Sequence, residues 1–236
     1  MLPSRARCSK TVLRRIRLFI RWTVGLFFGS TVIAVIVLRF VPVYFTPLMF
    51  IRLFQNDEVK LSHTWVPLEE MSEKMPLAVM ASEDAKFLEH HGFDFNAIQS
   101  AAKRNREHPE KNKLGASTIS QQTAKNVFLW PGRSWVRKGL EAYFTALIEL
   151  FWTKDRIMEV YLNSIEMGPG IYGVEAVAEE HFNRKASELT AENCALIAAT
   201  LPNPRKFSSK HPSNYMLKRQ KQILKNMRYI EVKSDK

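Results

Sequence analysis

One segment of the sequence, Trp22–Leu38, contains 17 consecutive residues without a charged side chain. A helix needs roughly 20 residues to cross a hydrocarbon core about 30 Å thick. Apolar residues on either flank supply the missing length, and Arg21 and Arg39 at the two ends are able to extend their charged groups toward the lipid headgroups. The segment therefore predicts one transmembrane helix, at residues 22–40.

The residues before this segment carry charge of one sign only. Residues 1–21 contain seven Lys or Arg and no Asp or Glu, a pattern that retains an N-terminus in the cytoplasm. A cleaved signal peptide is the main alternative, but Arg39-Phe40-Val41-Pro42 follows the apolar run without the small residues that a cleavage site needs. A buried core helix fits poorly with so many flanking positive charges. We therefore expect an uncleaved, single-pass anchor, with the rest of the chain outside the cytoplasm.

The net charge of the chain, +12, is concentrated at its N-terminal end. Residues 1–56 contain nine Lys or Arg and no acid, whereas residues 57–236 contain 26 basic and 23 acidic residues. This near balance disfavours a groove for nucleic acid. The two cysteines, Cys8 and Cys194, fall on opposite sides of the predicted membrane segment and are not expected to pair. No spacing of Cys and His indicates a metal site.

Residues 41–59 follow the predicted anchor as a stem that is rich in aromatic residues. Its uncharged part is too short to cross a membrane, and Pro42 and Pro47 interrupt it. Two interpretations stay open. The stem lies at the membrane interface and holds the following domain close to lipid, or it packs on that domain as an ordinary hydrophobic segment.

Helical periodicity dominates residues 60–236 and predicts a mostly α domain. The predicted helices run from a cap at Ser134 to about Trp152, from Asp155 to Ile165, from a start just after Gly173, from a cap at Thr190 to Pro202, and over the basic amphipathic tail Ser213–Arg228. Strand signals are few, and Thr64–Leu68 is the best of them.

The first candidate for chemistry is the segment Ala81–Asp94. Glu83 follows a mostly apolar run from Leu77 to Ala81, so its carboxyl is expected to emerge beside a core. A partly desolvated carboxylate suits a general base that accepts a proton in the transition state. A pair such as Glu83-Asp84 is more often a solvated helix end, so this segment alone does not establish catalysis.

The second candidate, Gly115–Asn126, combines hydroxyl, amide and ammonium groups. Ser117 or Thr118 is able to cap a helix, which places Thr118, Gln122 and Lys125 on one helix face. These groups and the N-terminal amides of a helix suit a diphosphate. Taken by itself, a capped surface helix without a ligand explains the segment better.

Two further segments place polar residues beside helix ends. Arg133–Glu141 contains Arg137 and Glu141 at i, i+4, with Arg133 just before the predicted helix. A structural ion pair is the ordinary interpretation of such a spacing. Tyr161–Gly173 joins a helix end to a glycine-rich turn, which shapes either a cleft wall or a tight connection.

Taken together and in this order, the four segments resemble the motifs of the peptidoglycan glycosyltransferases. This family includes the glycosyltransferase domain of bifunctional penicillin-binding proteins and the monofunctional transglycosylases. The resemblance covers about residues 60–210, and Gly-x-Ser-Thr-Ile-Ser-Gln-Gln followed by Lys-Asn is its most specific part. The predicted anchor and the absence of a transpeptidase domain resemble the monofunctional biosynthetic members of Gram-negative bacteria. Lys86 stands where many members have Arg, which is compatible with a cationic role but not with a bidentate one.

The resemblance implies a lysozyme-like α fold and the polymerisation of lipid II into β-1,4-linked glycan strands, with inversion at the donor sugar. Glu83 is then the base for the acceptor 4-hydroxyl, and Lys125 and Arg133 are cations for the undecaprenyl diphosphate leaving group. Glu141 is the second carboxylate, which either orients cations or helps to bind a divalent ion such as Mg²⁺ or Mn²⁺. No other cofactor is implied. Weaker substrate-binding candidates are Gln121, Ser117, Arg137, Asp84 and Lys86, and a looser final motif contains Asn203 and Arg205.

The expected partners are lipid II, the growing glycan strand, the inner membrane of a Gram-negative cell and other cell-wall synthases, with the domain in the periplasm. A lytic, lysozyme-like hydrolase is the closest enzymatic alternative, but it needs no diphosphate clamp such as Lys125 and Arg133. The non-enzymatic alternative is a membrane-anchored scaffold of the wall machinery that has lost activity. The presence of both Glu83 and Glu141 disfavours that alternative.

Overall fold

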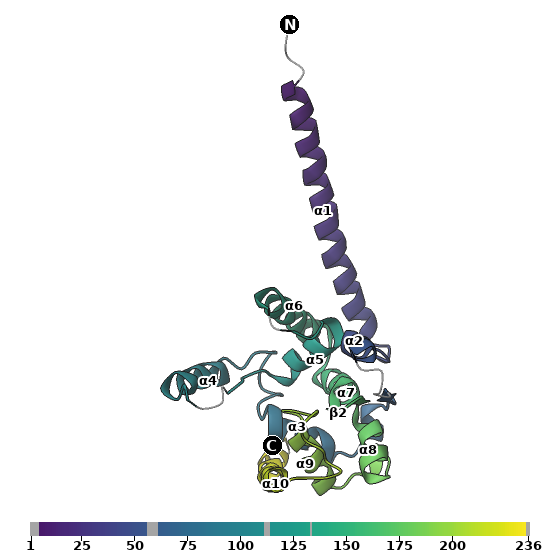
Figure 1. The fold of residues 1–236 in the computed structure, drawn as a ribbon, viewed down its shortest axis with the longest axis vertical. Coiled ribbons are helices and arrows are strands. Elements are labelled where there is room, and N and C mark those ends of the chain that lie inside the picture. Colours follow the sequence, from purple (N-terminus) through teal and green to yellow (C-terminus); the bar gives the residue numbers. More distant parts are fainter. Residues whose placement is uncertain (1–4, 56–60, 111–113, 133, 235–236) are drawn as a thin grey trace. The chain divides into compact units, whose positions relative to one another are not determined.

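The computed structural model describes residues 5–55, 61–110, 114–132 and 134–234, and most of them are helical (Figure 1). The helices are α1 (Arg5–Leu38), α2 (Pro47–Gln55), α3 (Lys74–Glu83), α4 (Phe95–Glu107), α5 (Ile119–Phe128), α6 (Trp135–Phe151), α7 (Lys154–Ser164), α8 (Val174–Phe182), α9 (Ala191–Thr200) and α10 (Asn214–Ser234). Two short 3-10 helices cover Leu68–Glu70 and Ala186–Glu188. The chain divides into two compact units, Met1–Val41 and Pro42–Lys236. The mostly α class predicted from the sequence is confirmed.

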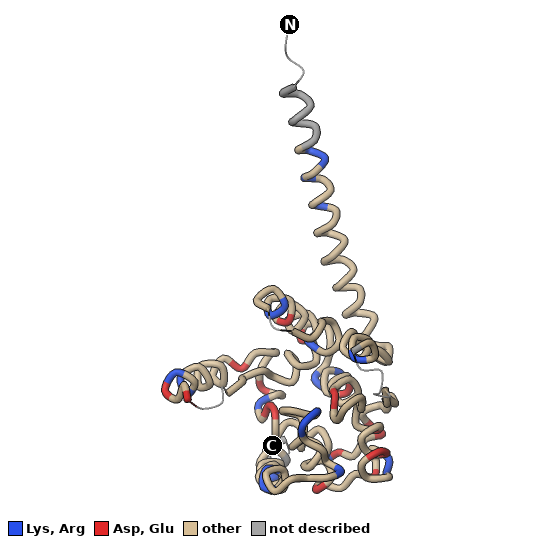
Figure 2. The backbone as a smooth tube through the Cα atoms, in the orientation of Figure 1, with Lys and Arg blue, Asp and Glu red and all other residues tan. Residues whose placement is uncertain are grey.

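The first unit is dominated by α1, a single helix of 34 residues. Its part Leu13–Leu38 is long and apolar enough to cross a membrane, by length and composition. Within the part of α1 that Figure 2 colours by charge, Lys and Arg lie near the start of the helix, and no acidic residue is present. The helix is longer than the predicted span at residues 22–40, and it fits the expected membrane anchor.

The stem that follows contains a regular helix, α2, which Pro47 begins rather than breaks. Pro47 occupies its first position, where a helix has no use for the missing N–H. The N–H of Met49 donates to Thr46 Oγ1 at 3.2 Å, which satisfies one of the free amides of the first turn. α2 packs against α5 with Met49 fully buried, while Phe50 and Phe54 stay exposed. The stem therefore packs on the domain along one face and leaves aromatic rings on another.

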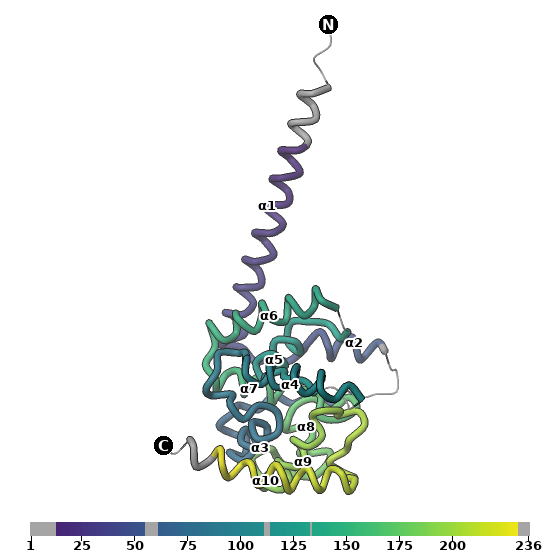
Figure 3. The backbone as a smooth tube through the Cα atoms, turned by 90° about the vertical axis from the view of Figure 1, so that its left-hand side faces the viewer, coloured from purple at the N-terminus to yellow at the C-terminus, as the bar shows by residue number. Residues whose placement is uncertain are grey.

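Six helices of the second unit form two groups. α3, α9 and α10 pack on one another, and α5 packs on α6 and α7. Figures 1 and 3 show the first group at one end of the domain, α5 and α6 at the other end, and α4 projecting to one side. Fully buried Met75 and Ile197 lie in the first group, and fully buried Ile119, Ile148 and Ile157 lie in the second. Each group thus has its own apolar contact, and polar residues gather between them.

Side-chain caps set the starts of several helices. Ser134 Oγ accepts from the N–H of Arg137 at 3.1 Å at the start of α6. Thr190 caps α9 in the same way, and α8 begins directly after Gly173, whose φ of 84° is one that residues with a side chain rarely adopt. The helices predicted at these three positions and over residues 155–165 are confirmed. The C-terminal helix is also confirmed, and it continues past Arg228 to Ser234.

A small sheet completes the domain. Its strands are β1 (Ser62–His63), β2 (Glu166–Gly168) and β3 (Ile171–Tyr172), in the order β1-β3-β2. β1 pairs parallel to β3, and β2 pairs antiparallel to β3. The turn between β2 and β3 is the glycine-rich turn of the sequence, so that turn forms a hairpin within the domain.

The strand predicted at Thr64–Leu68 is wrong, because a side chain takes the place of a strand partner there. Asn163, near the end of α7, accepts from the N–H of Val66 and donates to its C=O, each at 2.9 Å. These two bonds satisfy the backbone of Val66 without a neighbouring strand. Pairing is limited to Ser62–His63 just before it.

Candidate active site

Glu83 lies at the C-terminal end of α3, where the backbone leaves the helix at Asp84. Its side chain is 13% exposed, and both carboxylate oxygens have a donor. Gln122 Nε2 donates to Oε2 at 3.1 Å, and Ser82 Oγ donates to Oε1 at 3.1 Å. The carboxylate is therefore held in one orientation at the edge of the core, with part of its surface open.

Asp84 turns inward and joins the end of α3 to the start of α5. It accepts from the N–H of Ile119 at 3.1 Å, and His90 Nε2 lies 3.0 Å from each of its oxygens. The N–H of Gly92 donates to His90 Nδ1 at 3.1 Å, which leaves Nε2 as the ring nitrogen that donates to Asp84. These bonds occupy the Asp84 side chain, which positions Glu83 relative to α5.

Two of the predicted substrate-binding candidates, Gln121 and Ser117, lie at the start of α5 and have different surroundings. Thr118 is the cap: its Oγ1 accepts from the N–H of Gln121, and Gln121 Oε1 accepts from the N–H of Thr118 at 3.1 Å. Gln121 is buried by this reciprocal capping and does not line either of the cavities described below. Ser117, just before the cap, is exposed and does line one of them.

Gln122 links Glu83 to the core of the second helical group. Tyr161 Oη, fully buried on α7, donates to Gln122 Oε1 at 3.2 Å. Burial raises the pKa of Tyr161 well above its ordinary value, and the negative charges of Glu83 and Asp84 raise it further. The phenol therefore stays protonated, which fixes the amide oxygen toward Tyr161 and the amide nitrogen toward Glu83.

Lys125 lies one turn further along α5, half-buried. Burial lowers the pKa of its ammonium, and the neighbouring cations Arg137 and Lys138 lower it further, while Glu141 and Glu83 oppose this shift. The sign of the shift means that Lys125 loses its charge at a lower pH than an exposed lysine does. A partly desolvated ammonium interacts strongly with any anion that reaches it.

Glu141 is buried on α6 among cations. Its side chain is only 4% exposed, and its oxygens lie 3.4 Å from Arg137 Nη1 and 2.5 Å from Lys138 Nζ. The i, i+4 pair expected from the sequence is therefore present, with an additional i, i+3 contact from Lys138. The Glu141 carboxylate therefore holds the positive side chains of Arg137 and Lys138 close together on the face of α6 that lies toward Lys125.

Two cavities meet at Gln122 and Pro202, which line both of them. The larger one, about 670 Å³, is lined by Glu83, Lys86 and Ser117 among others. The smaller one, about 390 Å³, is lined by Lys125 and Arg137. The carboxylate and the cations thus occupy neighbouring compartments on either side of Gln122.

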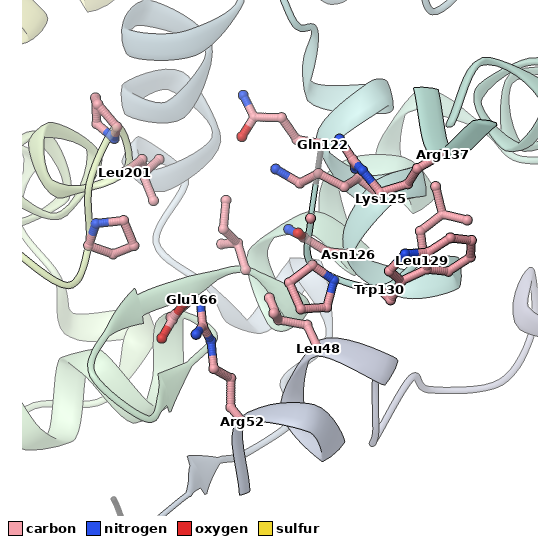
Figure 4. Close-up of a pocket in the computed structure, with 15 residues that line it drawn as sticks. Leu48, Arg52, Gln122, Lys125, Asn126, Leu129, Trp130, Arg137, Glu166 and Leu201 are labelled. Atoms are coloured by element: carbon pink, nitrogen blue, oxygen red, sulfur yellow. The ribbon is translucent and has the colours of Figure 1, made fainter. Parts of the chain in front are cut away.

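The far wall of the smaller cavity is also charged. Figure 4 shows Gln122, Lys125 and Arg137 on one side and Arg52 with Glu166 across from them. Burial raises the pKa of Glu166, and the positive charges of Arg52 and Arg205 oppose that shift. The positive charge of Arg205, a residue of the looser final motif, therefore acts on Glu166 in this wall.

The structure brings together most of the residues that the sequence singled out. Arg133 lies outside the described residues, and Lys86 is exposed on the rim of the larger cavity. Sequence reasoning missed the contacts of Ser82 and Lys138 with the two carboxylates and the contact of Tyr161 with Gln122. Lys138 had a usable signal, its i, i+3 spacing from Glu141. Tyr161 had none, since it lies 39 residues from its partner.

An N-terminal helix long and apolar enough to cross a membrane, a mostly α domain, and a fixed carboxylate beside a cation-lined cavity fit a membrane-anchored glycosyltransferase. Comparison with known proteins agrees. The family model described as Transglycosylase matches residues 52–228. This chain belongs to the transglycosylase family, and the family resemblance noted in the sequence is confirmed.

Several curated relatives, each called biosynthetic peptidoglycan transglycosylase, are similar over nearly their whole length. The protein of Bacteroides thetaiotaomicron is 59% identical over 222 residues, covering 92% of this chain and 89% of the relative. That of Bdellovibrio bacteriovorus is 55% identical over 213 residues, covering 89% and 84%. That of Pseudomonas syringae is 46% identical over 225 residues, covering 94% and 93%.

Proposed function

We propose that this chain polymerises lipid II into β-1,4-linked glycan strands by inverting displacement of undecaprenyl diphosphate. The name shared by its relatives supplies the reaction class, a peptidoglycan glycosyltransferase of cell-wall synthesis. The observation that carries the proposal is the pairing of cavities at Gln122, with a fixed carboxylate in one and cations in the other. A transfer from a diphosphate donor needs both groups next to each other.

Glu83 is the base in this proposal, and the acceptor occupies the larger cavity. The carboxylate takes the proton from the acceptor 4-hydroxyl as the oxygen attacks C1 of the donor sugar. Gln122 and Ser82 hold the two carboxylate oxygens, so little reorientation is needed before proton transfer. One displacement converts an α-linked donor into a β-linked product, and no covalent intermediate with the enzyme is needed.

The leaving diphosphate occupies the smaller cavity, where Lys125 and Arg137 meet the charge that develops as the bond from C1 to the phosphate oxygen breaks. Arg133 is proposed as a further cation from the sequence resemblance. Diphosphate leaves as an anion and needs no proton. Cations are therefore better suited to this position than a general acid.

Glu141 is proposed to orient these cations. Its carboxylate is engaged by Lys138 and Arg137, and Lys125 lies within electrostatic reach. Three positive groups around one buried carboxylate do not fit a divalent ion there, because the ion would meet like charges on every side. The proposed reaction therefore contains no step that uses a metal ion.

The proposal places α1 in the inner membrane and the domain in the periplasm. Seven positive and no acidic residues at 1–21 favour a cytoplasmic N-terminus, and one crossing then brings the domain to the other face. Lipid II is tethered to the same bilayer, so an anchored enzyme meets it at a raised effective concentration.

The two alternatives differ in what they predict for the cavities. A lytic hydrolase acting on finished glycan has no diphosphate to bind, so the partly buried cations Lys125 and Arg137 would have no substrate group to meet. An inactive scaffold would not need the Glu83 carboxylate held at both oxygens.

The test is incubation of purified full-length protein with labelled lipid II in one reaction and with finished glycan strands in another. We expect polymer from lipid II and no cleavage of the strands. Glu83→Gln, which keeps the shape of the side chain but not its basicity, should lower polymerisation by at least ~100-fold with unchanged helical content. Cleavage of finished strands would favour the lytic alternative. Wild-type turnover by Glu83→Gln would remove Glu83 from the role of base.

A further inference from the structure

The C-terminal helix α10 contributes an arginine to the larger cavity. The sequence predicts α10 only as a basic amphipathic helix, and the proposed function uses none of its residues. In the structure α10 packs against α3 and α9, and Arg219 lines the cavity that contains Glu83. The Arg219 side chain is 30% exposed, so most of it is covered by the domain.

Arg219 reaches Glu83 through the hydroxyl of Ser82. Arg219 Nη2 donates to Ser82 Oγ at 3.1 Å and lies 3.9 Å from Glu83 Oε1. The hydroxyl of Ser82 has one proton, with Glu83 Oε1 at 3.1 Å and the carbonyl oxygen of Ala198 at 3.2 Å as acceptors. Because the guanidinium occupies a lone pair of the hydroxyl oxygen and polarises it, the hydroxyl proton bonds more strongly to the carboxylate than it would alone.

We propose that Arg219 is a positioning residue for Glu83, acting through Ser82. The Arg219–Ser82 pair holds Oε1 while the Tyr161–Gln122 pair holds Oε2. The carboxylate is then fixed from two helical groups, and its remaining lone pairs face the cavity. This inference rests on the proposed role of Glu83 as the base.

The charge of Arg219 has a second consequence. Arg219 Nη2 lies 3.9 Å from Glu83 Oε1, so its positive charge attracts this oxygen and restrains the carboxylate without a direct hydrogen bond. Arg219 donates its hydrogen bond to Ser82 rather than to Glu83, so the lone pairs of the carboxylate stay available for the substrate proton. A guanidinium suits this position because it is charged at every working pH.

The experiment compares full-length wild type with Arg219→Gln, Arg219→Lys and a matched control, Arg228→Gln, by measuring kcat and KM for lipid II polymerisation. Arg228 is exposed on the same helix. For Arg219→Gln we expect a loss of about tenfold in kcat/KM, carried by kcat with KM little changed. Arg219→Lys, which keeps a positively charged donor, should recover most of the lost kcat, and Arg228→Gln should behave as wild type.

Ser82→Ala removes the hydroxyl through which Arg219 acts on Glu83. Alone it should lower kcat several-fold with KM little changed. If Arg219 acts through Ser82, the double variant Ser82→Ala/Arg219→Gln should lose less kcat than the product of the two single losses. Multiplicative losses would overturn the relay through Ser82.

The fold and the proposed function are controlled separately. Helical content and the thermal midpoint of each variant are measured, and if Arg219→Gln is unfolded, Arg219→Lys and Ser82→Ala decide. A folded Arg219→Gln with kcat within twofold of wild type would overturn the inference. Glu83→Gln is assayed in parallel: if that variant polymerises normally, it is the proposed function that fails, whatever Arg219 does.

Discussion

Replacement of Gln122 by leucine should produce two measurable losses that can be separated. The substitution keeps the approximate volume of the side chain but removes the amide that bridges Glu83 and Tyr161. A hydrogen bond to a charged group contributes about 1.5–3 kcal/mol. If that bond is realised fully in the transition state, its loss lowers kcat/KM by about 10- to 150-fold. The lipid II polymerisation assay measures this effect, with the exposed Gln99 replaced by leucine as a control.

The second loss is one of stability. Without Gln122 Oε1, the buried hydroxyl of Tyr161 has lost its acceptor, and an unpaired buried polar group costs about 1–3 kcal/mol. The thermal midpoint of Gln122→Leu should therefore fall, and the double variant Gln122→Leu/Tyr161→Phe should recover most of it, because both partners are then apolar. Activity should not recover in the double variant, because Glu83 Oε2 still lacks its donor. Activity of Gln122→Leu within twofold of wild type would refute the link to Glu83.

Three further predictions follow from the same structure. Because burial lowers the pKa of Lys125, activity should decline on the alkaline side as the ammonium loses its proton, and Lys125→Arg should move that limb to higher pH in the kcat/KM profile. Gly92→Ala should lower the free energy of unfolding by about 1–3 kcal/mol, since φ is 85° there and a Cβ would lie 2.8 Å from Thr145 Cγ2; a thermal midpoint equal to wild type would contradict this. A reporter that is active only in the periplasm, fused after Lys236, should be active, and an active cytoplasmic reporter at the same position would refute the topology.

The elements that the sequence predicts well are those with a local chemical cause. Ser134 and Thr190 cap helices through bonds that span three residues, and Gly173 ends a turn because its backbone conformation excludes a side chain. Such causes are contained in a window of a few residues. The apolar α1 belongs to the same group, because length and composition suffice to identify it.

The prediction of a strand at Thr64–Leu68 fails for the opposite reason. The residues around Val66 have the side chains of a strand, but the partner of the backbone is Asn163, 97 residues away. No residue near Val66 in the sequence indicates that hydrogen bond. The stem is a second example. From the sequence, Pro47 is interpreted as an interruption, but a proline at the first position of a helix is favourable.

The site shows the same division between local and distant causes. The sequence predicts roles for Glu83, Lys125 and Glu141 because each lies in a short segment, and the order of these segments resembles the motif order of the family. The residues that set the orientation of Glu83 are remote from it in the sequence. Gln122 lies 39 residues from Glu83, and Arg219, which contacts Ser82, lies 137 residues from Ser82. A helix can expose a carboxylate by itself, but a second helix is needed to hold each of its oxygens.

The arrangement of the two helical groups then explains how base and cations stay close without neutralising each other. Glu83 ends α3, in the group with α9 and α10, whereas Lys125 and Arg137 belong to α5 and α6. Gln122 lines both cavities and donates a hydrogen bond from its amide nitrogen to Glu83, so a neutral amide lies between the carboxylate and the two cations Lys125 and Arg137. A direct Glu83–Lys125 ion pair would occupy both groups before any substrate arrived. In the proposed reaction the amide keeps the carboxylate available for a hydroxyl proton and the cations available for a diphosphate.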